Sequence, residues 1–256
     1  MSPERAALPL RHALALGALH GPAELLPVSS SAHVALVPQL LGWPSATLPP
    51  ELRKSLEVML HTGSLVALLA VERPLAPWPA LLATVPAAAV GLLLEGPIEQ
   101  RLGGPRATAA GLLLGSAVLL LCDARGGTDR EAGGLTNGDA LALGLAQAAA
   151  LVPGVSRLGL TVSVARARGF GRPTAFSLGR RAGLPVLAGA TLLKGVRLVR
   201  DPPPRDVRAA LATGAVAALV SGIAAAPLRH TTPVRAVALE RAALAVAALR
   251  LARTRR

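Results

Sequence analysis

The chain has 256 residues, of which 52% are hydrophobic and only 16% are charged. Soluble domains carry roughly 25% charged residues, so this composition excludes an ordinary soluble protein and predicts an all-α, polytopic integral membrane protein. The formal net charge of +13 does not predict nucleic-acid binding, because the basic residues form no stripe with interleaved aromatic residues, which make up 2% of the chain. Instead, arginines punctuate the apolar runs, a pattern typical of loops that anchor to anionic lipid headgroups.

Apolar segments separated by proline, glycine and charge predict helices along the whole chain. Some of these segments are long enough to span a bilayer, which takes about 20 apolar residues. Others are too short and lie next to glycine or proline, which predicts re-entrant or broken helices. In chain order, the predicted helices cover 6–20, 34–42, 56–71, 77–95, 107–122, 138–151, 158–168, 182–199, 207–226 and 234–251.

The chain also reads as two halves of similar design. A glycine-rich stretch of mixed charge, 123–139, lies near the midpoint and predicts a linker between halves 1–122 and 140–256 of a single membrane domain, 1–256. Each half contains a proline followed by serines, Pro27-Val-Ser-Ser in the first and Pro153-Gly-Val-Ser in the second. We interpret this as an internal repeat, and transporter-like folds often pair two such halves and build a site from broken helices near the repeat interface.

The polar stretch of the second half is Pro153-Gly-Val-Ser-Arg-Leu-Gly-Leu-Thr161. Its proline and Gly154 break one helix, and the restarting helix offers unpaired N–H groups to an anion. Arg157 adds a planar fork of donors suited to phosphate, and Ser156 and Thr161 can add hydrogen bonds. An alternative reading makes Ser156 a simple helix cap and lets Arg157 extend to the membrane interface.

The polar stretch of the first half runs from Glu24 to His33. If 20–25 is helical, His20 and Glu24 are four residues apart and share a face. Three serines follow in the break, Ser29, Ser30 and Ser31. A serine run alone is typical of a loop or cap, but polar groups are costly in a membrane and indicate a functional site. Together the two stretches supply the carboxylate, imidazole, guanidinium and hydroxyls that suit a phosphate ligand.

These residues resemble a known family. The stretches 27–33 and 153–161 are similar to the two signature regions of the undecaprenyl-diphosphate phosphatases (the BacA/UppP family), and 56–65 looks like a third recurring segment of that family. The resemblance implies a polytopic helical protein with inverted repeats and re-entrant segments, whose site faces the outer side of the bacterial cytoplasmic membrane. It also implies removal of one phosphate from a C55 polyprenyl diphosphate, recycling of the carrier lipid for cell-wall synthesis, bacitracin resistance and a divalent cation.

The chain departs from the family pattern at several positions. His20 stands where the family normally has a first glutamate, and Glu24 holds the position of the second. A carboxylate pair would hold Mg²⁺ or Ca²⁺, whereas a histidine favours a softer metal or acts as an acid or base. The predicted metal ligands are therefore Glu24 and His20. Further departures are Ala32 for glycine, Leu158 for a small or hydroxyl residue, and 180–182 for a Phe-rich patch.

The two stretches and the resemblance together give a working mechanism. Arg157 would hold the diphosphate, and Glu24 would bind the cation or activate the nucleophile. Ser30 would attack or hydrogen-bond the phosphate, with His33 as general base or alternative nucleophile, and direct attack by water stays open. The predicted catalytic residues are Glu24, Ser30, His33 and Arg157, and the predicted substrate-binding residues are Ser29, Ser31, Gly154, Ser156 and Thr161.

Two other functions stay open at this point. One is a catalytically degenerate relative that binds or flips polyprenyl phosphate without hydrolysing it, which the histidine at position 20 permits. The other is a phosphatase for a different prenyl or lipid phosphate. In each case we expect a lipid substrate within a membrane, no nucleic-acid partner, and a homodimer as the candidate assembly.

Overall fold

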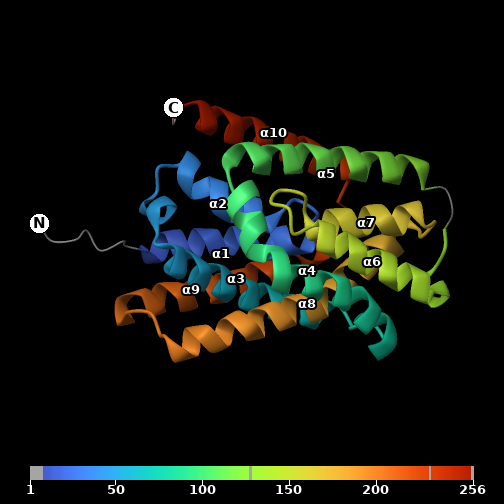
Figure 1. Cartoon of the computed structure of the whole chain (residues 1–256), viewed down its shortest axis with the longest axis horizontal. Helices are drawn as coiled ribbons and strands as arrows, with labels where there is room; N and C mark the ends of the chain where they lie inside the picture. The colour runs from blue at the N-terminus through green and yellow to red at the C-terminus, as the bar shows by residue number, and fades with distance from the viewer. Residues whose placement is uncertain (1–7, 127–128, 231, 255–256) are drawn as a thin grey trace, which may run out of the picture.

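The computed structural model describes residues 8–126, 129–230 and 232–254, and these residues fold into α-helices joined by short loops (Figure 1). Each predicted helix has a counterpart. Three short 3₁₀ helices, Pro44–Thr47, Ala132–Gly134 and Ala226–His230, lie in the connections. The helices are α1 (Leu10–Leu25), α2 (Ser30–Leu40), α3 (Pro50–Val71), α4 (Pro77–Leu102), α5 (Pro105–Arg125), α6 (Asn137–Ala149), α7 (Arg157–Ala167), α8 (Arg172–Arg200), α9 (Arg205–Ala225) and α10 (Val234–Thr254).

Several helix boundaries differ from the sequence prediction, and two of these differences have clear physical reasons. The prediction ended the first helix at position 20, but α1 continues through Pro22 to Leu25. Its Gly17 and Gly21 lie directly against the backbone of α9, so tertiary packing holds this segment helical despite the proline. The prediction also began the eighth helix at 182, but α8 starts at Arg172, because Arg180 is buried and paired rather than part of a loop.

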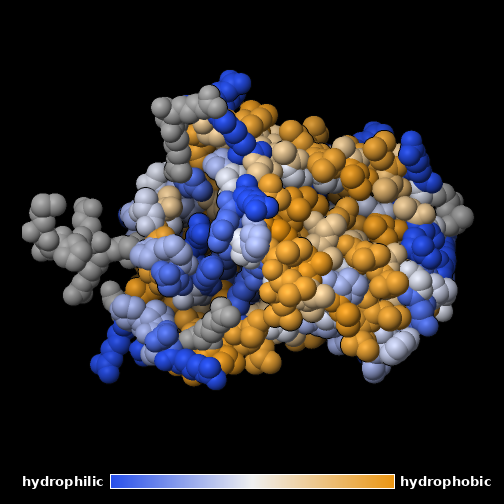
Figure 2. Space-filling view, in the orientation of Figure 1, coloured by the Kyte–Doolittle hydropathy of each residue, from blue (hydrophilic) through white to orange (hydrophobic). Residues whose placement is uncertain are grey.

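Five helical segments in the described part of the chain are long and apolar enough to cross a membrane, namely α3, α4, α5, α8 and Val207–Arg229. Large apolar side chains project outward from them, including Leu92, Leu93 and Leu192. Figure 2 shows hydrophobic residues over a broad central area, with hydrophilic residues gathered toward both ends of the molecule. A soluble protein does not expose so much contiguous apolar surface, and the chain is therefore a multi-pass membrane protein.

The two parts of the chain interlock rather than sit side by side. Helix α1 packs along α9, and α3 packs against both α9 and α8. Reciprocally, α6 packs on α4, and α5 lies alongside α10 at one edge of the bundle (Figure 1). Small residues permit the close approach, since a Cβ on Gly63 of α3 would collide with the Ala215 carbonyl of α9. The bundle centre is thus built by residues from both ends of the sequence.

Two helix interruptions lie inside this bundle. One separates α1 from α2 and the other separates α6 from α7. Ser29 and Ser156, each directly before the following helix, have φ angles of 73° and 70°, and they alone among the described non-glycine residues have positive φ. Such a conformation costs on the order of 1 kcal/mol or more and persists where the surroundings impose it, which is common at functional sites.

Candidate active site

The two interruptions bring a carboxylate, a hydroxyl and a guanidinium into contact. Glu24 lies in the last turn of α1, Ser30 begins α2, and Arg157 begins α7. A guanidinium nitrogen of Arg157 donates a hydrogen bond to one carboxylate oxygen of Glu24, and the Ser30 hydroxyl donates to the other at 2.6 Å. Glu24 is buried, and this contact joins residues far apart in the sequence into one site.

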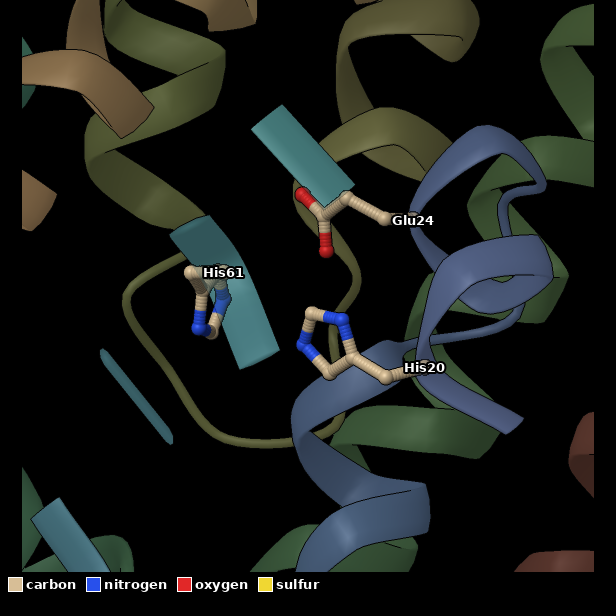
Figure 3. Close-up of side chains that lie close together, drawn as sticks. All are labelled: His20, Glu24 and His61. Carbon is tan, nitrogen blue, oxygen red and sulfur yellow. The ribbon is translucent and has the colours of Figure 1, made fainter. Parts of the chain in front are cut away.

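A second cluster shares Glu24. His20 lies one turn earlier on α1, and His61 projects from α3 toward both residues (Figure 3). One donor atom from each of His20, Glu24 and His61 lies within 4.8 Å of the others. The two imidazole rings meet edge to face, with their centroids 4.6 Å apart. Sequence reasoning missed His61 as a site residue, although it lies within the third family-like segment, 56–65.

The hydrogen bonding of this cluster fits a bound cation. The Nδ1 of His61 donates to the Glu57 carbonyl at 2.7 Å, which leaves its Nε2 as an acceptor. His20 is fully buried, yet neither of its ring nitrogens has a hydrogen-bond partner. Leaving a buried polar atom unsatisfied costs about 1–3 kcal/mol. Two imidazoles and a carboxylate form a common ligand set for a catalytic metal ion, so these residues fit a divalent cation.

His33 is held by a residue that the sequence did not point to. Its Nδ1 donates to the Ser29 carbonyl at 2.9 Å, and its Nε2 lies 2.8 Å from a carboxylate oxygen of Glu240 on α10. Both ring nitrogens therefore face acceptors, an arrangement that is satisfied when both carry protons. An imidazolium held in this way has no free lone pair with which to attack phosphorus or abstract a proton.

Arg241, the next residue on α10, ties the two interruptions together. It is fully buried, and it donates to the Pro27 carbonyl at 3.2 Å, to the Gly154 carbonyl at 2.9 Å and to the Val155 carbonyl at 2.8 Å. A buried guanidinium in a membrane protein is costly unless carbonyls or carboxylates satisfy it. The sequence placed this arginine inside an ordinary apolar helix, because its partners lie on distant loops.

The predicted site residues of the second half have different roles in the structure. The Ser156 hydroxyl accepts from the Gly159 N–H at 3.1 Å and caps α7, as the alternative reading expected. Arg157 does not extend to the interface but contacts Glu24. The Thr161 hydroxyl donates to the Arg157 carbonyl at 3.0 Å, so it is used within the helix.

The remaining predicted residues line the breaks. Gly154 has a φ of +88°, and a Cβ there would collide with the Thr108 carbonyl. The Ser29 hydroxyl lies 3.5 Å from that of Ser31, and Ser29 is buried whereas Ser31 is exposed. Ser31 lines a cavity, while Gly154 shapes the loop beside Arg157 through its backbone.

One cavity reaches this centre, and a second cavity adjoins the first. The smaller, about 180 Å³, is lined by Arg157, His61 and apolar residues of α8, including Leu187. The larger, about 350 Å³, is lined by charged and polar residues such as Ser31, Arg53 and Glu99 together with apolar ones. Glu57 and Lys194 line both cavities. Cavities that combine charged groups with apolar walls suit a ligand with a charged head and a hydrocarbon tail.

The fold and this centre define the chain as a multi-pass membrane protein with a buried polar site. A family model described as "Bacitracin resistance protein BacA" matches residues 13–74 and 72–228. The undecaprenyl-diphosphatase of Geobacter metallireducens is 38% identical over 234 residues, covering 82% of this chain and 85% of the relative. The undecaprenyl-diphosphatase of Geobacter sulfurreducens is 38% identical over 236 residues, covering 83% of this chain and 86% of the relative. The chain belongs to the BacA family, which confirms the resemblance.

Proposed function

We propose that this chain is an undecaprenyl-diphosphatase, which hydrolyses a polyprenyl diphosphate to the monophosphate and thereby recycles the carrier lipid for cell-wall synthesis. The support is twofold: membership of the BacA family, and relatives named undecaprenyl-diphosphatase that match over most of their length. The observation that carries the proposal is the contact of Arg157 and Ser30 with the two oxygens of Glu24. The same family supports a role in bacitracin resistance.

Substrate binding falls to Arg157 and the start of α7. The guanidinium lines the smaller cavity and presents a fork of donors that matches phosphate oxygens. The N-terminus of α7 adds unpaired backbone N–H groups, which favour an anion. Ser29, Ser31, Gly154, Ser156 and Thr161 stay predicted substrate-binding residues, with Gly154 acting through its backbone. These donors would offset the charge that gathers on the transferred phosphoryl group.

Ser30 is the proposed nucleophile. Its hydroxyl already donates to Glu24 at 2.6 Å, so the carboxylate is in position to take the proton as the serine oxygen attacks the terminal phosphorus. The bond from phosphorus to the bridging oxygen then breaks, and polyprenyl monophosphate leaves. Water would hydrolyse the phosphoserine to release phosphate. In the alternative route, Glu24 activates a water molecule that attacks the phosphorus directly.

His33 has a supporting role in this scheme. Its contacts with Ser29 and Glu240 favour an imidazolium, which adds positive charge next to the serine run and can give a proton to the leaving phosphate. This role fits its hydrogen bonds better than that of base or nucleophile. A divalent cation held by His20 and Glu24, together with His61, would polarise the phosphate when bound.

We also propose the finer architecture. The residues 1–122 and 140–256 would form inverted repeats within one membrane domain, joined by the linker 123–139. The element order supports this, since the short helices α2 and α7 each follow a serine with positive φ, about half a chain length apart. The short helices would be re-entrant, and the site would open to the outer face of the bacterial cytoplasmic membrane. The homodimer stays a prediction.

Phosphate release tests the proposal. Purified wild type in detergent would be given undecaprenyl diphosphate, and we expect release of inorganic phosphate with a monophosphate product. Arg157→Ala should lower kcat/KM by about 10²-fold or more. The matched control is Arg181→Ala, because Arg181 bonds to the Arg73 carbonyl away from this centre. Lipid binding without phosphate release in wild type would refute the phosphatase and favour a carrier.

A further inference from the structure

The largely buried cluster of His20, Glu24 and His61 has an unusual donor composition for the cation that the sequence led us to expect. Mg²⁺ and Ca²⁺ are hard ions that take six or more oxygen ligands, and the expected site was a pair of carboxylates. Here one carboxylate is accompanied by two imidazoles, whose donor atoms lie within 4.8 Å of it (Figure 3). Imidazole nitrogen suits zinc, iron, copper and nickel better than magnesium or calcium.

His61 is oriented as metal-binding histidines usually are. A ligating histidine typically donates its other ring N–H to a carbonyl or carboxylate, which fixes the tautomer and the ring position. The Nδ1 of His61 donates to the Glu57 carbonyl at 2.7 Å, one turn earlier on α3. The lone pair is therefore on Nε2, and the ring meets that of His20 rather than a protein hydrogen-bond donor. The His61 Nε2 can therefore bind a metal ion without any change of tautomer.

His20 supplies the independent observation. Only 1% of the residue is exposed, and both its Nδ1 and its Nε2 lack a hydrogen-bond partner. Among the described histidines, His12 has one buried ring nitrogen without a partner, Nδ1, and its ring stacks on Trp43. An unpartnered polar atom in a buried site needs an explanation. A metal ion accepting the His20 lone pair provides one.

Glu24 still has lone pairs free to bind a metal ion as the third protein ligand. Each carboxylate oxygen has two lone-pair sites, and the hydrogen bonds from Arg157 and Ser30 occupy one on each oxygen. We propose that His20, Glu24 and His61 form a site for a nitrogen-accepting divalent transition-metal ion, with Zn²⁺ as its best representative, in preference to Mg²⁺ or Ca²⁺. Three protein ligands leave a coordination position open, as in catalytic zinc sites with two histidines and a glutamate. The role of the ion in phosphate chemistry rests on the proposed function, but its binding does not.

The test measures metal binding rather than activity. Full-length protein in detergent would be stripped with a chelator and titrated separately with Zn²⁺, Mn²⁺, Mg²⁺ and Ca²⁺, and bound metal would be counted by mass spectrometry. We expect one Zn²⁺ per chain, bound at least about 10-fold more tightly than Mg²⁺ or Ca²⁺. His61→Gln should weaken Zn²⁺ binding at least about 10-fold. His20→Glu should shift the preference toward Mg²⁺, and His12→Gln is the matched control.

Each outcome has a definite meaning. Equal or tighter binding of Mg²⁺ or Ca²⁺ by wild type overturns the proposal, as does loss of Zn²⁺ in His12→Gln to the same extent as in His61→Gln. The wild-type titration needs no variant, so misfolding of a histidine variant cannot obscure it. Phosphate release with Mg²⁺ and no zinc preference would sink this inference and leave the proposed function standing. Preferential zinc binding without phosphate release in the presence of any metal would support this inference and refute the proposed function.

Discussion

Arg157, the first residue of α7, donates a hydrogen bond to Glu24 in the last turn of α1, so the interrupted helices of the two halves meet at a single ion pair. Both side chains are mostly buried, at 21% and 5% exposed. A buried charge stripped of its partner typically costs about 3–5 kcal/mol, so neither residue is free to change alone. The pair also explains how a carboxylate can stay charged next to the serine that it would activate.

Ser30→Ala should lower kcat by about 10³-fold or more, because the variant lacks the hydroxyl that donates to Glu24. A phosphoenzyme trapped from radiolabelled substrate in wild type should disappear in this variant. Ser55→Ala is the control, since the Ser55 hydroxyl donates to the Glu51 carbonyl of its own helix turn and Ser55 lies outside this centre. Full turnover by Ser30→Ala would assign the attack to water.

Glu240→Gln should lower kcat more than it raises KM, because His33 loses the carboxylate that keeps its second ring nitrogen protonated. Glu240→Asp should restore part of the rate, since it restores the negative charge. Steady-state kinetics across pH would measure both variants. Equal kcat values for Glu240→Gln and Glu240→Asp would show that His33 does not depend on the negative charge of Glu240.

Arg241→Gln should destabilise the protein and reduce activity together, because the three carbonyl partners of this guanidinium belong to both interruptions. Loss of a buried network of this kind costs on the order of 3 kcal/mol. Thermal unfolding in detergent would measure the change, with Arg250→Gln on an exposed position of the same helix as control. An unchanged unfolding temperature would show that the loops hold each other without Arg241.

Asp139 gives a prediction about pH and stability. Burial raises the pKa of this carboxyl, but hydrogen bonds from Arg130, Arg168 and Thr136 outweigh burial and hold the pKa well below its ordinary value of 3.8. A lowered folded-state pKa means that the stabilisation is fully present above about pH 4 and is lost as pH falls toward the folded value. Asp139→Asn should lower the unfolding temperature at pH 7. It should also make the unfolding temperature fall less as the pH is lowered. Exposed Asp201→Asn should do neither.

Much of the architecture could be read from the sequence because its signals are local. Proline and glycine beside hydroxyls marked both interruptions, and Ser156 caps α7. The spacing of His20 and Glu24 predicts a shared face if 20–25 is helical, and α1 does extend through both residues. The membrane class followed from composition. In each case the determining residues are neighbours in the chain, so short-range rules apply.

What the sequence could not provide depends on contacts between distant helices. His61, Glu240 and Arg241 join the centre from α3 and α10, and local patterns describe them only as polar residues in apolar helices. The start of α8 was missed for the same reason. Arg180 looks like a loop residue until Glu72, its partner at 2.6 Å, is placed beside it.

The central claim is that Glu24 and Arg157 act on one diphosphate, and a double-mutant cycle on kcat/KM tests it most directly. Glu24→Gln, Arg157→Gln and the double variant would be assayed for phosphate release from undecaprenyl diphosphate. Residues that act as a unit are non-additive, so the double variant should be no slower than the slower single variant within about threefold. Effects that multiply, with the double variant losing the product of both single losses, would contradict a shared site.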